Sequence, residues 1–193
     1  MKESYEIIDI DKGFKKLDGT KIENLVTYIN EIRQTEKAQL AGDNFKISIG
    51  TDSAFKSKDT HWNVLYITTI AFTYGNLGTH LIYREDSIRG KWSNKLLLST
   101  RLWREVEISA ELAKWLFENV EISPEVHMDI NPNENFDSNI LFTAAQGYID
   151  SLGFAAQLKP DAAVASCAAD HYLRKKKSRT RNREQKRKGK RYA

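Results

Sequence analysis

Three consecutive segments between residues 45 and 84 carry strand patterns, and the chain beyond them alternates between helix and strand patterns. Apolar and polar side chains alternate over residues 45–52, and residues 62–74 are rich in β-branched and aromatic side chains. A Gly-Asn-Leu-Gly turn then leads into residues 79–84. Residues 53–60 are polar and are predicted to form a loop. The pattern predicts an antiparallel meander of three strands.

The remaining segments predict an α/β fold. A helix is expected over residues 20–36, before the meander. After it we expect a helix, a strand, a helix, a strand and a helix over residues 94–119, 126–130, 138–152, 154–159 and 161–172. A meander followed by such alternation predicts a mixed five-stranded sheet with helices on both faces.

Charge is divided unevenly along the chain. Residues 174–193 contain twelve of the 30 Lys and Arg and one of the 26 acids, which leaves 18 bases against 25 acids in residues 1–173. We therefore expect three parts: an N-terminal helical extension over residues 1–44, an α/β domain over residues 45–173, and a basic tail. The tail is expected to be disordered, because it has almost no apolar side chains and its cations repel one another.

Three carboxylates occupy positions where burial would be costly. Asp52 and Asp129 each follow an apolar strand segment, and the apolar stripe of the helix over residues 94–119 includes Glu105. A carboxylate in such a place requires a cation to offset its desolvation. Oxygen ligands are those that Mg²⁺ and Mn²⁺ prefer, so the three acids predict a divalent metal site. By contrast, Glu107 and Glu111 share a stripe with Arg104 and are expected to form surface ion pairs.

A fourth metal ligand is expected after the fifth strand, where two acids compete. Asp161 would lie at the start of the last helix, near the other carboxylates, although it could equally serve as the helix N-cap. Asp170 lies nine residues further on, about 13 Å along a helix axis, so the two acids do not easily share one metal pair. We favour Asp161 and keep Asp170 as the alternative. His127 could shuttle protons beside Asp129 or serve as a structural residue.

The basic tail predicts contact with nucleic acid. A flexible run of cations binds phosphates without regard to sequence and with strong salt dependence. The candidate contacts are Lys175, Lys176, Lys177, Arg179, Arg181, Arg183, Lys186, Arg187 and Lys188. The alternatives are a tail that engages an acidic protein partner, or one that serves solubility or localisation.

Four segments resemble, in the same order, the YkuK-like family of predicted RNase H-like proteins. They are Ile49–Ser53, Val126–Pro132, Ser138–Asn139 and Gly153–Asp170. The resemblance implies the RNase H/integrase superfamily fold, which carries one acid on the first strand, one on the first crossover helix, one on the fourth strand and one near the last helix. Asp52, Glu105, Asp129 and Asp161 fill these four positions. The run from Asp161 to Ala165 also resembles the final-helix motif of RuvC-type resolvases.

The resemblance further implies a metal-dependent nuclease in which these four acids are catalytic. It would hydrolyse phosphodiester bonds in RNA, RNA–DNA hybrid or structured DNA, with two Mg²⁺ or Mn²⁺ ions about 3.5–4 Å apart on either side of the scissile phosphate. The alternative is a non-catalytic nucleic-acid-binding or regulatory protein on the same scaffold, with the tail supplying the affinity.

The cellular setting can also be predicted from the sequence. The single cysteine, Cys167, cannot form an intramolecular disulfide, and the start of the chain has no apolar segment typical of a signal peptide. No run of 18 apolar residues suggests a membrane span. A cytoplasmic location without membrane contact is therefore expected, and the oligomeric state is left open.

Overall fold

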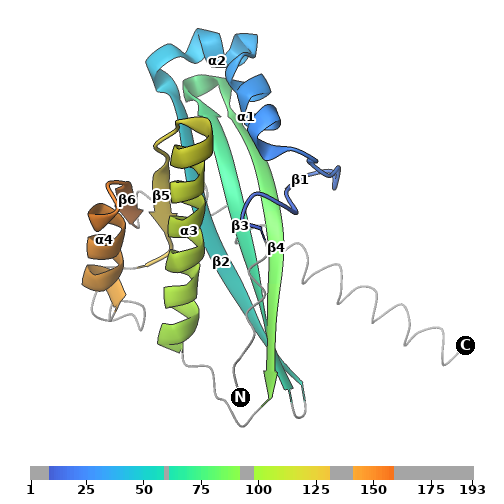
Figure 1. Ribbon diagram of the computed structural model, residues 1–193, viewed down its shortest axis with the longest axis vertical. Helices are drawn as coiled ribbons and strands as arrows, with labels where there is room; N and C mark the ends of the chain where they lie inside the picture. Colours follow the sequence, from blue (N-terminus) through green and yellow to red (C-terminus); the bar gives the residue numbers. More distant parts are fainter. Residues whose placement is uncertain (1–8, 59–60, 92–97, 131–140, 159–193) are drawn as a thin grey trace, which may run out of the picture.

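The computed structural model describes residues 9–58, 61–91, 98–130 and 141–158. Its centre is a six-stranded mixed sheet with strand order β1-β4-β3-β2-β5-β6 (Figure 1). The strands are β1 (Lys15–Lys16), β2 (Phe45–Lys58), β3 (His61–Tyr74), β4 (Thr79–Lys91), β5 (Glu125–Met128) and β6 (Ala155–Leu158). Strands β2, β3 and β4 form the predicted antiparallel meander, while β5 runs parallel to both β2 and β6.

The sheet has one strand more than the sequence pattern predicted. β1 is only two residues long, and it pairs Lys15 with Tyr83 and Lys16 with Ile82 at the outer edge of β4. A segment of two residues is too short to show the alternation of polar and apolar side chains that marks a strand. The prediction of five strands was therefore wrong, because it did not include this edge strand. Phe14, beside β1, is buried in the main core, which fixes the N-terminal segment to the sheet.

The predicted loop over residues 53–60 was also wrong. β2 and β3 pair without interruption from Phe45 and Tyr74 to Lys58 and His61, and β4 continues along β3 as far as Lys91. The polar side chains here belong to a paired strand rather than to a loop. Pairing along both sides of β3 satisfies the hydrogen bonds of the backbone N–H and C=O groups, whichever side chains the strands carry. Asp52 is therefore an interior residue of a long strand.

Four helices are described, α1 (Leu25–Arg33), α2 (Glu36–Ala41), α3 (Leu98–Val120) and α4 (Phe142–Ser151), with 3-10 turns η1 (Gly42–Asn44) and η2 (Gly75–Leu77). The single helix expected over residues 20–36 is instead two. Asn24 caps α1 by accepting from the Thr27 N–H (2.9 Å), and Thr35 caps α2 by accepting from the Ala38 N–H (3.3 Å). Two N-cap side chains eleven residues apart begin two helices, so the apolar periodicity did not show the break.

The helices share one apolar core with the sheet. α3 packs along β2 and also contacts β5, and it is flanked by α1 and α4. The core joins Ile49 and Ile70 of the strands to Leu112 and Leu116 of α3, and it includes Leu25 of α1. None of the described helices is long and apolar enough to cross a membrane. The last predicted helix, over residues 161–172, and the basic tail lie outside the described residues.

A row of buried polar side chains crosses the sheet beneath α3. The strand register aligns Thr51 with Thr68 and Thr68 with Arg84. The Ser109 hydroxyl of α3 donates to Thr51 Oγ1 (2.9 Å), and Thr51 Oγ1 lies 3.3 Å from Thr68 Oγ1. Arg84 forms an ion pair with Asp86 (2.7 Å).

This row marks a boundary between two parts of the sheet, which we call the body and the arm. The arm consists of residues 53–58, 61–66 and 86–91, and Figure 1 shows its three strands continuing past the other elements. On the α3 side the arm residues Trp62, Val64, Tyr66 and Ile88 form a small apolar cluster with Ile108 of α3.

Candidate metal centre

Glu105 lies on the buried side of α3, as its position in the apolar stripe predicted. Its side chain is 7% exposed, and its Oε1 accepts a hydrogen bond from the Ser53 hydroxyl (2.5 Å). Burial is the main cause that raises the pKa of Glu105, to about 8, and the hydrogen bond from Ser53 acts in the opposite direction. Without a cation, this carboxyl is therefore predominantly protonated at neutral pH.

Asp52 lies on β2 next to Ser53, at the point where the body becomes the arm. Its Oδ1 accepts from the Ser53 backbone N–H (2.7 Å), and its side chain is partly exposed. Side chains alternate along a strand, and Ser53 faces Glu105 on α3, so Asp52 belongs to the opposite face of the sheet. The structure corrects its expected place at a strand end.

Asp129 directly follows β5 and is also partly exposed. β5 pairs with β2 through Glu125 and Ser48, Val126 and Ile49, and His127 and Gly50. Asp52 and Asp129 each lie two residues beyond the last pair of this register, Gly50 and His127. The parallel pairing therefore brings to the same end of the paired region two acids that are far apart in the sequence.

The three carboxylates are linked electrostatically through Glu105. The negative charges of Asp52 and Asp129 both raise the pKa of Glu105. In the described part of the chain, β5 accompanies β2 only as far as Gly50, so at Asp52 no strand covers this edge of β2. The open edge allows charges on the two faces to act on each other. The sequence-predicted acids Asp52, Glu105 and Asp129 thus share one neighbourhood.

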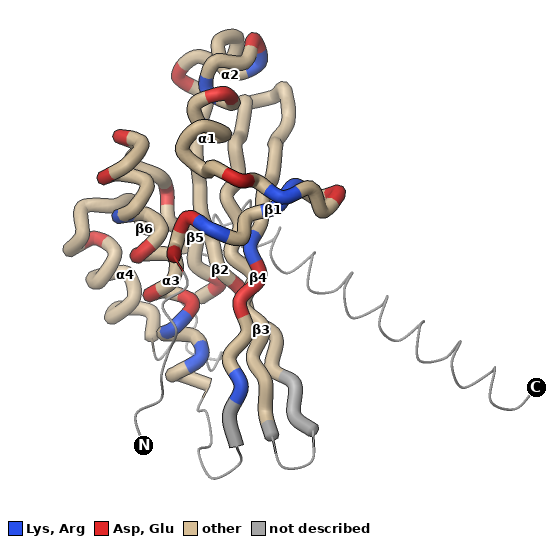
Figure 2. The backbone as a smooth tube through the Cα atoms, turned by 45° about the vertical axis from the view of Figure 1, so that its right-hand side comes forward, with Lys and Arg blue, Asp and Glu red and all other residues tan. Residues whose placement is uncertain are grey.

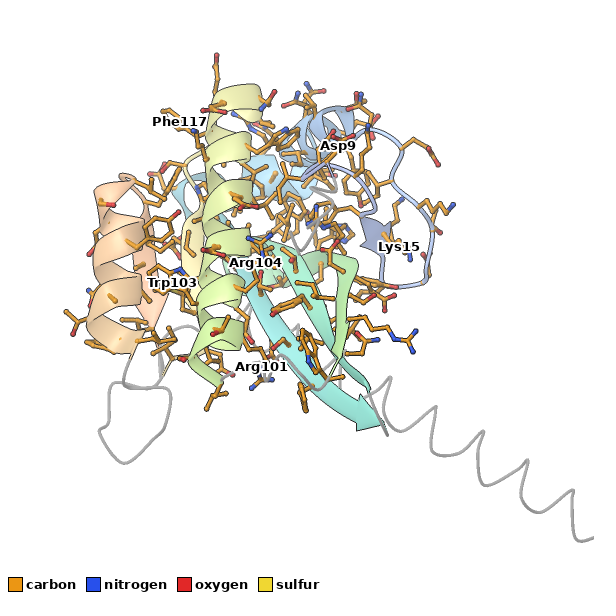
Figure 3. The ribbon with its side chains drawn as sticks, turned by 60° about the horizontal axis from the view of Figure 1, so that its bottom comes forward. Asp9, Lys15, Arg101, Trp103, Arg104 and Phe117 are labelled. Carbon is orange, nitrogen blue, oxygen red and sulfur yellow. The ribbon has the colours of Figure 1, made fainter. Side chains whose placement is uncertain are left out.

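Arg101 adds the one described cation that acts on Glu105 directly. It lies one turn before Glu105 on α3, and its guanidinium donates to the Ser53 carbonyl oxygen (Nη1–O 3.2 Å). Its positive charge lowers the pKa of Glu105, against the effect of burial. In Figure 3, Arg101 lies toward the start of α3. A partly exposed cation beside a buried acid is suited to hold an anionic group of a substrate.

The carboxylate oxygens of this site are suitable ligands for a hard divalent cation, but the described residues do not form a complete metal site. Three carboxylates, of which Glu105 is buried and feels the charge of the other two, offer the oxygen ligands that Mg²⁺ and Mn²⁺ prefer. Among the described residues, no three His, Cys, Asp or Glu side chains are grouped closely enough to hold a metal ion on their own. Asp161 and Asp170, the two candidates for the fourth ligand, lie outside the described residues, as do the tail cations.

His127 and the remaining acids of α3 have partners of other kinds. His127 is buried, its Nε2 lies 3.4 Å from Glu125 Oε2, and burial lowers its pKa. Its Nδ1 is buried without a hydrogen-bond partner among the described residues. Arg104 pairs with Glu107 (3.1 Å) and Glu111 (3.4 Å), which confirms the predicted ion-paired face of α3.

Two features of this site were not predicted from the sequence. Arg101, Glu105 and Ser109 are spaced by four residues and thus share one helix face, a signal that could have identified Arg101. Ser53 was expected in a loop, and its hydrogen bond to Glu105 depends on β2 continuing beyond Asp52. No local pattern showed that continuation.

Comparisons with known proteins agree with this architecture. The model of the ribonuclease H-like family matches residues 24–174, which extend from the cap of α1 past the end of β6. No curated protein and no solved structure matches the chain significantly. The family match confirms the resemblance seen in the sequence motifs, and the mixed sheet with its meander and parallel strands is consistent with an RNase H-like fold. The chain is a member of the ribonuclease H-like family, of the YkuK-like type.

Proposed function

We propose that this protein is a metal-dependent nuclease that hydrolyses phosphodiester bonds by a two-metal mechanism. The observation that carries the proposal is the shared neighbourhood of Asp52, Glu105 and Asp129, in which two acids raise the pKa of a third. Concentrated negative charge at the open edge of a central strand is costly unless a cation offsets it. Family membership supports a nuclease-like scaffold and a general role with nucleic acid.

Asp52 and Asp129 would be the central ligands, with Glu105 and either Asp161 or Asp170 completing the set. Bound Mg²⁺ or Mn²⁺ would activate a water for in-line attack and stabilise the departing 3′-oxygen. The residues of the chain position these carboxylates: Ser53 holds Glu105 through its hydroxyl, and its backbone N–H orients Asp52. Glu105 must lose its proton to bind a cation, so metal binding by this site releases protons.

Arg101 would hold the phosphate beside the acids. Its guanidinium is already oriented by the hydrogen bond to the Ser53 carbonyl oxygen. The Arg101 side chain therefore loses less conformational entropy when substrate binds. RNA and RNA–DNA hybrid are the substrates we favour, with structured DNA as the other candidate. The tail cations, from Lys175 to Lys188, would add affinity that does not depend on sequence.

The test is cleavage of labelled RNA, hybrid and branched DNA with Mg²⁺ or Mn²⁺, using matched acid substitutions. We expect Asp52→Asn and Glu105→Gln to abolish metal-dependent cleavage. Glu107→Gln, two residues along the same helix, should retain it, because Glu107 only pairs with Arg104 on the surface. Equal activity in Glu105→Gln and Glu107→Gln would refute the assigned role of Glu105.

A non-catalytic nucleic-acid-binding role is the second candidate. It is favoured by the raised pKa of Glu105, because an uncharged carboxyl can stay buried without any metal. The described acids also do not form a group of three around a common point. Under this alternative the wild-type chain binds nucleic acid in a salt-sensitive way, does not cleave it, and is unaffected by Asp52→Asn.

A further inference from the structure

Phe55 is a large apolar residue of the arm that the fold leaves on the surface. It is 43% exposed, whereas Trp62 and Tyr66, the other two large aromatic residues of the arm, are buried. A single exposed apolar side chain is common on protein surfaces, so the neighbours of Phe55 decide what it could bind. The nuclease mechanism proposed above assigns no role to this ring.

Phe55 lies one step along β2 from the candidate metal centre. Side chains two residues apart on a strand share a face, so Phe55 is on the α3 side of the sheet with Ser53, about 7 Å further along the strand. The register agrees, because Phe55 pairs with Val64, which belongs to the cluster with Ile108 of α3. Ser53 itself donates its hydroxyl to Glu105. The exposed ring therefore follows, on the same face, the residue that holds a candidate metal ligand.

A cation lies beside this part of β2. The Arg101 guanidinium donates to the carbonyl oxygen of Ser53, two residues before Phe55 (3.2 Å). Figure 2 shows basic residues (blue) near the start of α3 and acidic residues (red) beyond them. Leu98, about one turn before Arg101 on the helix surface, is also exposed. The start of α3 and the neighbouring part of β2 thus combine a partly exposed cation with two exposed apolar side chains.

This combination of groups matches the chemistry of a nucleotide. A nucleotide carries a phosphate, which the planar guanidinium of an Arg binds well, and a base whose flat face stacks on an aromatic ring. The ring of Phe55 has no polar atom, so it would accept any base and add no sequence preference. Family membership gives the chain a general role with nucleic acid, which makes a base the occupant we favour.

Stacking on a protein ring sets a condition on the nucleic acid. A base inside a duplex is already stacked on its neighbours and paired with its partner, so its face is not accessible to a side chain. Taking such a base out of the duplex costs free energy, and that cost is lowest for a base that is already single-stranded. An exposed Phe beside the metal centre therefore favours substrates with an unpaired base at that place.

We propose that Phe55 stacks on the base of an unpaired nucleotide next to the scissile phosphate, while Arg101 holds that phosphate. Of the substrates considered above, single-stranded RNA and the single-stranded part of a branched structure would then be preferred to a continuous hybrid. The position of the scissile phosphate rests on the proposed function, but stacking of a base on Phe55 can be measured without cleavage.

The test uses the full chain with Asp52→Asn, in EDTA, so that no cleavage interferes. Fluorescence anisotropy measures its affinity for a single-stranded RNA and for the RNA–DNA hybrid of the same sequence. The quantity compared between variants is the ratio of these two affinities. The basic tail is the same in every variant, so its contacts with phosphate do not change the comparison.

The variants are chosen to separate stacking from apolar contact. Phe55→Leu removes the ring and keeps an apolar side chain, whereas Phe55→Trp keeps a surface for stacking. The control is Phe117→Leu, which makes the same change at another exposed Phe. Figure 3 shows Arg101 and Phe117 toward opposite ends of α3, and Phe117 is about 18 Å from Glu105 along the helix axis.

We expect Phe55→Leu to weaken binding of the single strand about tenfold and binding of the hybrid by less than about twofold. Phe55→Trp should bind the single strand at least as tightly as the chain with Phe55, and Phe117→Leu should leave both affinities unchanged. The same affinity ratio in Phe55→Leu and Phe117→Leu would overturn the proposal. Equal losses of affinity for the two nucleic acids in Phe55→Leu would also overturn it.

Photocrosslinking tests the stacking without any change at Phe55. Single-stranded RNA that carries 5-iodouridine is irradiated with the Asp52→Asn chain, and mass spectrometry locates the residue to which the stacked base becomes attached. We expect a crosslink to Phe55, and crosslinks confined to other residues would overturn the proposal. Binding of single strands that depends on Phe55, by a wild-type chain that does not cleave, would instead refute the nuclease function and leave the stacking proposal standing.

Discussion

In the body, β2, β3 and β4 lie beneath α3 and share a core that reaches from Phe14 to Phe154, whereas the arm contributes only to two small apolar clusters, one on each face of the sheet. Between the two lies a level at which almost every side chain is polar. Thr51, Thr68 and Arg84 form one rung there, and Asp52 lies on the next. The body therefore holds most of the buried apolar side chains of the sheet, and the arm holds few.

The difference between body and arm shows where such a fold can accommodate buried charged groups that reduce its stability. A buried acid and a buried ion pair would weaken a small core, but at the junction the large core of the body provides the stability that offsets them. Glu105 and Arg84 both occupy this level, on α3 and β4.

The largest effect is expected from Glu105, through pH. Its folded-state pKa of about 8 lies above the unfolded value of 4.5, so the folded chain keeps a proton that the unfolded chain releases between these pH values. In EDTA, the free energy of unfolding of wild type should fall relative to Glu105→Gln as pH rises from 4.5 to 8, by a total on the order of 5 kcal/mol. Urea unfolding of both chains at several pH values measures this. A difference that does not vary with pH would mean that Glu105 is charged in the fold.

Arg84 should come next, because it ties the N-terminal segment to β4 at the junction. Its guanidinium pairs with Asp86 and donates to the Ile10 carbonyl oxygen (2.7 Å), with little exposure of either charged side chain. Arg84→Met leaves Asp86 buried without its cation and should cost about 3–5 kcal/mol. Adding Asp86→Leu should recover much of this loss, which a double-mutant cycle measures. Equal losses in the single and double variants would show that the ion pair is not the cause.

The body and the arm can be compared directly with two isoleucines. Ile70 is fully buried in the main core, whereas Ile88 is partly buried in the arm cluster. We expect Ile70→Ala to cost about 2–5 kcal/mol and Ile88→Ala about 1–2 kcal/mol, as measured by chemical unfolding. Equal costs would contradict the assignment of stability to the body.

Much of the fold followed from local patterns. The alternation in residues 45–52 and 62–74 and the periodicity of residues 94–119 gave the meander and α3, and the strand order then follows from rules for connections. The length of the arm could not be predicted, because its polar face makes a paired strand look like a loop. The two-residue β1 and the break between α1 and α2 depend on tertiary contacts and on caps.

The candidate site was predicted only in its parts. Glu105 could be found because an acid interrupts an apolar helical stripe, and its burial confirms that reasoning. That Asp52 and Asp129 both act on Glu105 depends on the parallel register of β2 and β5, which no local pattern fixes. Ser53 and Arg101 were missed because their roles arise from contacts between β2 and α3.

The most direct test of the proposed metal centre is a Mn²⁺ titration of the full chain by electron paramagnetic resonance. This method measures the concentration of free Mn²⁺ and requires no substrate. We predict that wild type and Glu107→Gln bind Mn²⁺ equally well. Asp52→Asn and Asp129→Asn should each weaken binding at least tenfold, since losing even a supporting group costs about 10–100-fold in metal affinity. Mn²⁺ binding that is unchanged by both Asp substitutions, or absent from wild type, would contradict a metal centre at the junction of body and arm.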